Sequence, residues 1–538
     1  MGAGRASQCD CEVAVDGHSL TLEDLERVAR HGWRAVLAPA ARLGLEASRR
    51  TVEDLIDREE AVYGVTTGFG KFAEVVISRD QTEELQRNLI MSHAAAVGPP
   101  FREDVVRGIM LLRANALASG HSGVRPAVVE LLLEMLNRGV HPVIPQQGSL
   151  GASGDLAPLA HMSLVVVGMG EAVFDGRVMP GADALAAVGL SPLTLGAKEG
   201  LALINGTQAM TATTGLAWTD ASRLARVADV AAALTVEACR GIPAAYDQRV
   251  HALRPHPGQV EVAANLRTLL AGSGFTTSSG EIRVQDPYTL RCTPQVHGAV
   301  RDSLDHIRRV LEIEINAVTD NPLVFEGGEV ISGGNFHGQP VAIAADLLAI
   351  AAADLAVISE RRIERLVNPQ LSGLPAFLTR YPGLHSGFML AQYTAASLVS
   401  ENKVLAHPAS VDSIPSSANQ EDHVSMGTTA ARKAASVVAN VSWVLGIELM
   451  CAAQALEMRA ETLGEAGTLR EAETEGCSPS LLSTRRLGAG TGPAYRVVRA
   501  AIPSWDEDRV LHPDLEAARG LAAGTALLYA VERVVGPL

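Results

Sequence analysis

Over most of the chain, hydrophobic and polar positions alternate with the period of an amphipathic helix. The run Thr21-Leu22-Glu23-Asp24 resembles a capping box, which predicts a helix start. The apolar positions that continue this helix share one face: Leu22, Leu25, Val28 and Ala29. Helical spacing returns over about 82–96 and 102–120, so we expect several amphipathic helices in the N-terminal third.

Three long proline-free stretches follow, at roughly 198–240, 341–367 and 424–460. A helix of 40 residues would be about 60 Å long. Helices of that length suggest a bundle with coiled-coil-like packing, within one chain or across subunits. Two short hairpins are expected at 172–179, turning at Asp175-Gly176, and at 324–331, turning at Gly327-Gly328. Neither is large enough for a sheet core, so the predicted fold is mainly α.

These patterns divide the chain into four predicted regions. Residues 1–12 are interpreted as a flexible extension, 13–197 as an N-terminal domain, and 198–460 as a central long-helix bundle. Residues 461–538 are interpreted as a C-terminal helical appendix, interrupted by a glycine-rich loop at 488–493.

Composition and charge narrow the class of partner. The 538 residues are 47% hydrophobic and 20% charged, a balance typical of soluble globular proteins. The formal net charge of −15 argues against nucleic acid or an anionic membrane as partner, because both reward clustered Lys and Arg. Six scattered cysteines do not form a disulfide framework, and we interpret Cys9 and Cys11 as part of a tail rather than a metal site.

Membrane insertion is not expected either. The N-terminus has no apolar run of signal-peptide type. The apolar stretch 341–358 contains Asp346 and Asp354, which favours a buried bundle helix over a membrane span. We therefore expect a cytoplasmic protein.

The run from Gly148 to His161, Gly-Ser-Leu-Gly-Ala-Ser-Gly-Asp-Leu-Ala-Pro-Leu-Ala-His, can carry unusual chemistry. The nitrogen of Gly154 can attack the carbonyl carbon of Ala152, because glycine has no Cβ to block a tight turn. Loss of water closes a five-membered ring, and loss of the Ser153 hydroxyl leaves an exocyclic methylene. The product, 4-methylidene-imidazole-5-one (MIO), is a carbon electrophile that accepts an amine. Ala-Ser-Gly alone is more often a plain turn.

The full run resembles the signature of the aromatic amino-acid ammonia-lyase and aminomutase family, whose members carry MIO. The resemblance covers about Leu20 to Pro513. It implies a long-helix bundle of the ammonia-lyase (fumarase/aspartase-like) type and no external cofactor. It also implies a homotetramer whose active sites draw residues from three chains, with a small amino acid as substrate.

Further motifs match the family's site elements in chain order. Taken singly, each is more often structural than catalytic. The residues that the resemblance assigns to the site, besides Ala152-Ser153-Gly154, are Tyr63, Ser92, His93, Asn205, Gln285, Tyr288, Arg291, Phe336 and Glu421.

Two stretches resemble the family members that act on histidine, 285–292 and 400–415. Ser92-His93 suits a polar substrate group that donates and accepts hydrogen bonds, although some tyrosine aminomutases share this pair. Glu421 discriminates better, because its carboxylate can bind or deprotonate an imidazole but has nothing to pair with on a phenyl ring. The implied reaction is non-oxidative deamination of L-histidine to trans-urocanate and ammonia, the first step of histidine degradation.

The resemblance also implies roles. Tyr63, in a glycine loop, is the first choice for the base that removes the β-proton, and Tyr288 and Glu421 are competing candidates. Arg291 is expected to hold the substrate carboxylate with its guanidinium fork. Asn205 and Gln285 are expected to hold the amine, the MIO oxygen or the carboxylate. Phe336 is expected to pack near the electrophile and the substrate.

Alternatives stay open. Another MIO enzyme, an aromatic lyase or an aminomutase, is the second interpretation, and His385 favours it because some tyrosine aminomutases have His where histidine-acting members have Asn. We interpret His385 as lying outside direct contact with substrate. A helical scaffold without activity would have no use for an electrophile precursor. A metal-dependent lyase lacks ligands at typical spacing.

Overall fold

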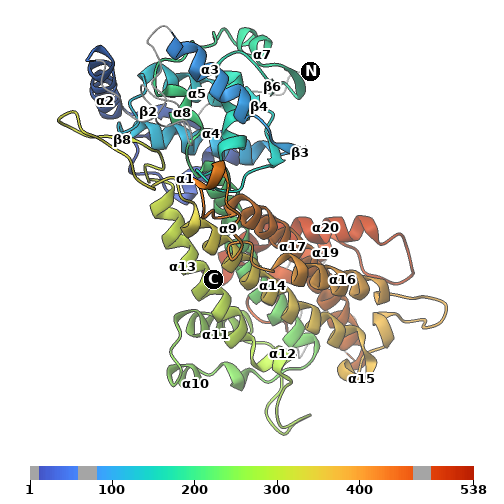
Figure 1. The fold of residues 1–538 in the computed structure, drawn as a ribbon. Helices are drawn as coiled ribbons and strands as arrows, with labels where there is room; N and C mark the ends of the chain where they lie inside the picture. The colour runs from blue at the N-terminus through green and yellow to red at the C-terminus, as the bar shows by residue number, and fades with distance from the viewer. Residues whose placement is uncertain (1–10, 59–80, 465–485) are drawn as a thin grey trace. The chain divides into compact units, whose positions relative to one another are not determined.

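A computed structural model describes residues 11–58, 81–464 and 486–538 (Figure 1). Contacts divide the chain into two compact units, each built from three segments. Unit 1 comprises Met1–Thr219, Ile307–Asp346 and Pro408–Lys433, and unit 2 comprises Asp220–His306, Leu347–His407 and Ala434–Leu538. The four predicted regions follow the order of the chain rather than its contacts, and they stay a prediction. The first strand begins at Glu12, inside the predicted extension.

Unit 1 is mainly helical and also contains small sheets. Its helices are α1 (Leu22–His31), α2 (Pro39–Asp57), α3 (Thr82–His93), α4 (Glu103–Ala118), α5 (Pro126–Asn137), α6 (Leu156–Val166), α7 (Gly181–Ala187) and α8 (Glu199–Ile204). The expected helix start is confirmed: the Thr21 side chain accepts from the Asp24 N–H, the Asp24 side chain accepts in return, and all four predicted core positions are buried.

In the part of unit 1 that the structure describes, the strands form four separate sheets of two or three strands. They are β1 (Glu12–Val15) parallel to β2 (Arg34–Leu37), β3 (Val97–Pro100) with β5 (Pro145–Gln147), β4 (His141–Pro142) with β6 (Glu171–Phe174) and β7 (Arg177–Pro180), and β8 (Leu323–Val324) with β9 (Val330–Ile331). The two predicted hairpins are confirmed as β6–β7 and β8–β9. The β1–β2 pair was not predicted, because strands of four residues show too few alternating positions.

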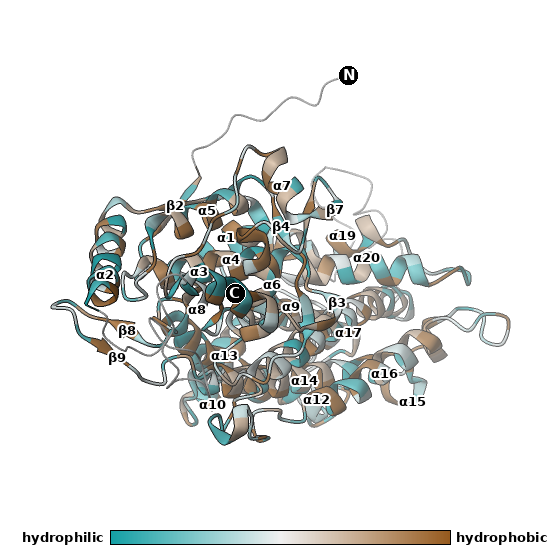
Figure 2. Cartoon of the chain, turned by 45° about the horizontal axis from the view of Figure 1, so that its top comes forward, coloured by the Kyte–Doolittle hydropathy of each residue, from teal (hydrophilic) through white to brown (hydrophobic). Residues whose placement is uncertain are grey.

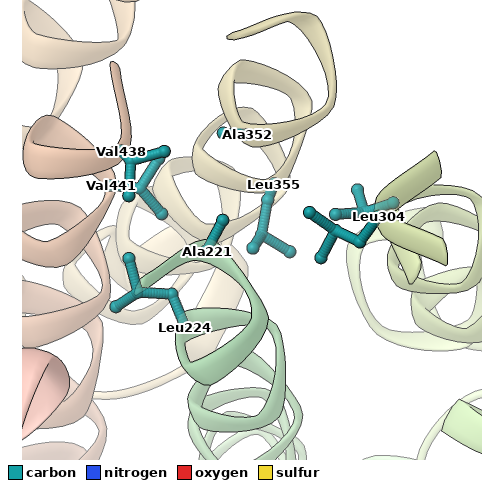
Figure 3. Close-up of a pocket in the computed structure, with 8 residues that line it drawn as sticks. Ala221, Leu224, Leu304, Ala352, Leu355, Val438 and Val441 are labelled. Atoms are coloured by element: carbon teal, nitrogen blue, oxygen red, sulfur yellow. The ribbon is translucent and has the colours of Figure 1, made fainter. Parts of the chain in front are cut away.

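Four long helices run through unit 2: α9 (Gln208–Ala238), α13 (Thr293–Glu314), α14 (Gln339–Val367) and α17 (Gly427–Thr462), each with one end in unit 1. Their apolar side chains meet around a cavity of about 10 Å³ (Figure 3). It is lined by Ala221, Leu224, Val300, Leu304, Ala352, Leu355, Val438 and Val441. This space holds about one water molecule and has apolar walls, so it is a packing defect rather than a substrate site.

Shorter helices complete unit 2. They are α10 (Gln248–Ala252), α11 (Pro257–Leu269), α12 (Tyr288–Arg291), α15 (Pro369–Ser372), α16 (Met389–Leu405), α19 (Thr491–Ala501), α20 (His512–Ala523) and α21 (Ala526–Val535). Within the predicted C-terminal appendix, the described residues 486–538 contain α19, α20 and α21, and α19 starts inside the predicted loop 488–493.

The long helices confirm the mainly α fold, with one correction. The stretch 198–240 is two helices, because the chain leaves helical geometry at Asn205 and α9 starts only at Gln208. The Gly206 carbonyl accepts a hydrogen bond from the Asp155 N–H, which pulls this backbone toward another loop. The predicted spans 341–367 and 424–460 match α14 and α17 to within three residues.

By length and composition, α14 and α17 could each cross a membrane, but 67% and 72% of their most apolar windows are buried in the protein. Burial of this extent is typical of core helices. Surface helices have mixed faces instead: both polar and apolar colours follow one another along α2 in Figure 2, and its buried positions recur every three or four residues.

Candidate active site

The Ala-Ser-Gly loop lies in unit 1, between β5 and α6. Gly148, Gly151 and Gly154 have φ angles of 132°, 71° and 73°, which glycine adopts without strain. Gly151 and Gly154 pair as an isolated β-bridge, so the chain turns back on itself across Ala152 and Ser153. The loop is therefore already compressed at the residues that would cyclise.

The backbone at Gly154 leaves no room for a side chain. A Cβ there would overlap the carbonyl oxygen of Gly206, with which Gly154 forms a parallel bridge. A glycine nitrogen in such a turn can approach the Ala152 carbonyl without steric hindrance. The residues present therefore fit the precursor of MIO.

The buried carboxylate of Asp155 forms hydrogen bonds beside the Ala-Ser-Gly loop. Asp155 is fully buried; it accepts from the Ser149 hydroxyl at 3.2 Å and the Met210 N–H at 2.8 Å, and it also pairs with the Thr428 hydroxyl. Burial raises the pKa of the Asp155 carboxyl to about 6, although these hydrogen bonds lower it. The group can therefore exchange a proton near neutral pH, directly beside the loop.

The segment that contains Glu421 covers the same loop. The Ser425 hydroxyl donates to the Gly151 carbonyl at 3.3 Å, and the Met426 N–H donates to the Leu150 carbonyl at 2.9 Å. Glu421 is partly exposed and accepts from the Ser416 hydroxyl at 2.8 Å, within a β-bridge between the two residues. One oxygen of the carboxylate is thus held, which orients the other.

Two histidines stack between this segment and the Phe336 loop. The rings of His337 and His423 lie 5.7 Å apart at 5° to one another, and His337 Nε2 lies 3.1 Å from the His423 carbonyl oxygen. A carbonyl only accepts, so Nε2 carries the proton. Phe336, the chain neighbour of His337, is half-buried.

The predicted pair Ser92-His93 ends α3. His93 Nδ1 lies 2.8 Å from the Leu89 carbonyl oxygen and 3.1 Å from the Ser92 hydroxyl. Because a carbonyl oxygen only accepts, Nδ1 carries the proton in neutral His93 and Nε2 keeps its lone pair. The following backbone is tied to α6, since the Ala96 N–H donates to His161 Nε2 at 3.2 Å.

Asn205 is buried where α8 ends. Its Nδ2 donates to Asp320 Oδ1 at 3.3 Å and to the Asn321 carbonyl at 3.0 Å. Within the described residues, its Oδ1 is buried and has no hydrogen-bond partner. The adjacent Gly206 contacts Gly154, so Asn205 is joined to the electrophile loop through one residue of backbone.

The remaining predicted residues belong to unit 2. Gln285 is exposed and Tyr288 is 70% exposed, before and at the start of α12. Arg291 donates from Nε to the Asp286 carbonyl at 2.8 Å, and its guanidinium lies 4.6 Å from the Tyr288 ring centroid. Because Nε makes this bond, the two Nη nitrogens keep the fork geometry that a carboxylate fits.

The structure thus places five of the predicted elements in unit 1: the Ala-Ser-Gly loop, Ser92-His93, Asn205, Phe336 and Glu421 with its neighbouring segment. Tyr63 lies outside the described residues. Sequence reasoning assigned no role to the groups that brace the loop, namely Asp155, Ser425 and Thr428. Only the position of Asp155, directly after Ala-Ser-Gly, could have signalled one.

His385 is in unit 2. The Asp508 N–H donates to its Nδ1 at 3.0 Å, and its ring lies 5.9 Å from that of Tyr381. Its effect on the substrate stays a prediction. In the described ranges, no three His, Cys, Asp or Glu side chains are grouped as metal ligands.

A mainly helical fold that compresses a small-residue loop above a buried carboxylate is the architecture expected for an enzyme with a backbone-derived electrophile. Comparison with known proteins places the chain more closely. Residues 20–475 match the family model described as aromatic amino acid lyase. The chain belongs to this aromatic amino acid lyase family.

Relatives of the chain extend over its full length. It is 60% identical over 528 residues to the histidine ammonia-lyase of Symbiobacterium thermophilum, covering 98% of this chain and all of that protein. Among solved structures, histidine ammonia-lyase from Trypanosoma cruzi is 41% identical with a TM-score of 0.87, over 97% of this chain and 96% of that one. Tyrosine aminomutase from Streptomyces globisporus is 40% identical with a TM-score of 0.90, over 98% and 99%.

Proposed function

We propose that this protein deaminates L-histidine to trans-urocanate and ammonia, as a carbon–nitrogen lyase. The observation that carries the proposal is full-length similarity, at 60% identity, to a protein named histidine ammonia-lyase. Two further relatives of that name are 58% and 55% identical over 94% and 97% of the chain. Solved neighbours of nearly equal TM-score include a lyase and an aminomutase, so the shape of the backbone does not separate the two.

The electrophile is proposed to form from Ala152, Ser153 and Gly154. The family uses MIO, which when formed would supply an electrophilic carbon for the substrate amine. The amine would thereby become a better leaving group. The glycine geometry, the bridge to Gly206 and the proton-exchanging Asp155 support its formation here. Asp155 and the Ser149 hydroxyl that donates to it can serve the proton transfers of dehydration.

Recognition of the imidazole is proposed for Glu421 and His93. The second oxygen of Glu421 can accept from the ring N–H, while Ser416 holds the first. His93 Nε2 offers an acceptor to a second polar group. A phenyl substrate would leave these groups unpaired, which costs roughly 1–3 kcal/mol for each buried group.

The carboxylate and proton-transfer roles follow the family resemblance. Arg291 is proposed to bind the substrate carboxylate, with Gln285 beside it, and Phe336 to cover the apolar side of the site. Tyr63 is proposed as the base for the β-proton, with Tyr288 and Glu421 as competitors. The guanidinium of Arg291 lies 4.6 Å from the Tyr288 ring centroid, which places a positive charge beside this candidate base.

A homotetramer with shared sites is proposed for the assembly. Exposed apolar residues on α14 recur every seven positions, at Ile343, Ile350 and Val357, with exposed fractions of 52%, 47% and 42%. Such a stripe is typical of a helix that packs against another helix in a bundle. The exposure of Tyr288 is also consistent with a role in a site completed by another chain. The cytoplasm is the proposed location.

The test is to incubate the purified protein with L-histidine and follow urocanate by its ultraviolet absorbance, with L-tyrosine and L-phenylalanine in parallel. Urocanate from histidine alone is the expected result. Cinnamate, coumarate or a β-amino acid from another substrate would overturn the choice of substrate while keeping the chemistry. The intact mass, lower by two waters, reports formation of the electrophile independently.

Glu421→Gln sharpens the choice of substrate. Gln keeps the size and an acceptor oxygen but lacks the charge, so kcat/KM for histidine should fall at least about tenfold, the effect of about 1.4 kcal/mol. Glu84→Gln, on the exposed face of α3, is the matched control and should leave kcat/KM unchanged. Equal activity of both variants on histidine would contradict the role of Glu421.

A further inference from the structure

A buried ion pair, between Lys198 and Asp320, lies next to the Asn205 side chain. Lys198 Nζ is 2.7 Å from Asp320 Oδ2, and both side chains have no exposed surface. The other oxygen, Asp320 Oδ1, accepts from Asn205 Nδ2 at 3.3 Å and from the Asn321 N–H at 2.7 Å. One carboxylate therefore connects a buried cation with the Asn205 amide.

A second buried cation fixes the backbone at the same point. Arg113 Nη1 donates to the Asn205 carbonyl at 3.0 Å and to Gln208 Oε1 at 2.9 Å. A Cβ on Gly206 would overlap this guanidinium, so the chain is pressed against it. The main chain of Asn205 is thus held independently of its side chain.

These partners determine which way round the amide lies. Nδ2 faces two acceptors, the Asp320 carboxylate and the Asn321 carbonyl. A flipped amide would place its oxygen against two other oxygens and lose both hydrogen bonds. The oxygen of Asn205 is therefore the free end, and it is buried without a partner among the described residues.

The backbone of Lys198, one partner of the ion pair, is strained. Lys198 has φ of 72°, a left-handed conformation that costs a non-glycine residue roughly 1–2 kcal/mol. Burial would raise the pKa of the Asp320 carboxyl, but the charges of Lys198 and Arg113 lower it, so the group stays ionised. An ionised carboxylate can only accept, which maintains the orientation of the amide.

We propose that Asp320, held by Lys198, is a positioning residue that turns the Asn205 oxygen toward the substrate, so that Asn205 accepts a hydrogen bond from the amino group. This inference rests on the proposed function, in which Asn205 belongs to the site. Of the three groups considered for Asn205, the MIO oxygen and the substrate carboxylate are acceptors and need a donor. The amine alone complements a free carbonyl oxygen.

The test separates binding from turnover. In a Ser153→Ala background, which cannot form the electrophile, binding of L-histidine and of 3-(imidazol-4-yl)propionate is measured by calorimetry. The propionate lacks only the amine, so the ratio of the two Kd values reports the amine contact. Replacing the pair by Lys198→Met with Asp320→Leu removes both charges together, which is better tolerated than leaving one buried charge unpaired.

The double replacement should weaken histidine binding by about tenfold and leave propionate binding unchanged, the effect of losing one oriented hydrogen bond to a charged group. Loss of both ligands to the same degree, or of neither, would overturn the inference. If the double replacement does not fold, Asp320→Asn replaces it; its amide can donate, so Asn205 can flip, and the same ratio should change by about threefold.

The matched control is the neighbouring ion pair. Glu199 accepts from Arg125 at 2.6 Å and is also buried, and within the described residues its carboxylate is hydrogen-bonded to Arg125 and Gly196 rather than to Asn205. Arg125→Met with Glu199→Gln should leave the Kd ratio unchanged.

If the wild-type protein converts tyrosine or phenylalanine instead of histidine, the proposed function fails, and the ratio is then measured with that amino acid and its deaminated acid.

Discussion

Two clusters of buried charged residues, one in each unit, differ in how completely their polar atoms are paired. In unit 2, Glu448 accepts from Arg362 Nη2 at 2.9 Å, from Ser359 at 2.6 Å and from Thr235 at 2.9 Å, and these partners stand on α9 and α14. None of these four side chains has an unsatisfied buried atom in the described part of the chain. The cluster is closed in the sense that all four side chains are fully paired, and it joins α9, α14 and α17.

The unit 1 cluster is open. Arg113 leaves Nε and Nη2 without partners, and Asn205 leaves Oδ1 without one, among the residues that the structure describes. Unsatisfied buried groups are costly, and they persist where they serve a ligand or a reaction. The comparison of these two clusters indicates that the Glu448 cluster contributes to stability, whereas the Asn205 cluster serves chemistry.

The largest expected effect comes from Gly154→Ala, in the open region. The new Cβ would overlap the Gly206 carbonyl, and φ of 73° is strained for alanine. The loop could not compress, so the mass deficit of two waters should disappear and urocanate formation should fall by more than about 1,000-fold. Intact mass and initial rates are the measurements.

Gly176→Ala is its control. Gly176 has φ of 71° in the β6–β7 turn, with nothing within 4 Å of an added Cβ. It suffers the same backbone strain, about 1–2 kcal/mol, without the overlap. A mature, active Gly154→Ala protein would show that the loop needs no compression.

Next comes Arg362→Met, in the closed cluster. It leaves Glu448 charged and buried, and it removes the donor 3.3 Å from His297 Nε2. The free energy of unfolding should fall by about 3–5 kcal/mol. Urea unfolding measures this, and activity per folded molecule should stay within twofold. Adding Glu448→Gln should restore most of the stability; a loss of activity without a loss of stability would reverse the comparison.

A pH series distinguishes a buried carboxylate without a cation from one that has a partner. Burial raises the pKa of Glu237 in unit 2 to about 7, although the Gly488 N–H donates to it. Ionisation of Glu237 disfavours the folded state. The stability that the protonated carboxyl contributes is therefore lost, and the free energy of unfolding falls, as pH rises from about 4.5 to about 7. Glu237→Gln should therefore gain up to about 3 kcal/mol over wild type at pH 8 and nothing below pH 4.

Glu199 behaves in the opposite way. Burial would raise the pKa of Glu199, but hydrogen bonds from Arg125 lower it. The ionised Glu199 carboxylate therefore stabilises the folded state above the ordinary pKa of a glutamate, and this stabilisation is lost as pH falls. Glu199→Gln should therefore be less stable than wild type at pH 8, with the difference shrinking in acid. Parallel pH profiles for both variants would refute this assignment.

The smallest effect is expected for Ser416→Ala. It removes the 2.8 Å hydrogen bond that orients Glu421, at the partly exposed edge of the site. A loss of about 1 kcal/mol corresponds to roughly a fivefold decrease in kcat/KM for histidine. Thermal unfolding should be unchanged, in contrast to Arg362→Met, and the Ser400→Ala control on α16 should alter neither quantity.

The sequence predicts the helices well because each depends on local spacing, as the buried face of α1 shows. It does not show the break at Asn205–Thr207, since apolar residues continue on both sides and the cause is a hydrogen bond to Asp155, some fifty residues earlier. The pair of Lys198 and Asp320 is likewise separated by 122 positions. Long-range partners of this kind leave no periodic signal.

The bracing of the Ala-Ser-Gly loop also has a consequence in time. Ser425 is 274 positions after Gly151, and Thr428 is 273 after Asp155. At about 5–20 residues per second, a ribosome needs roughly 14–55 s to add this length of chain. Until then the nascent polypeptide lacks the hydrogen bonds that Ser425 and Thr428 make to Gly151 and Asp155. A chain that ends before Ser425 cannot form these hydrogen bonds, so we expect the proposed electrophile to form only after this segment has been synthesised and folded.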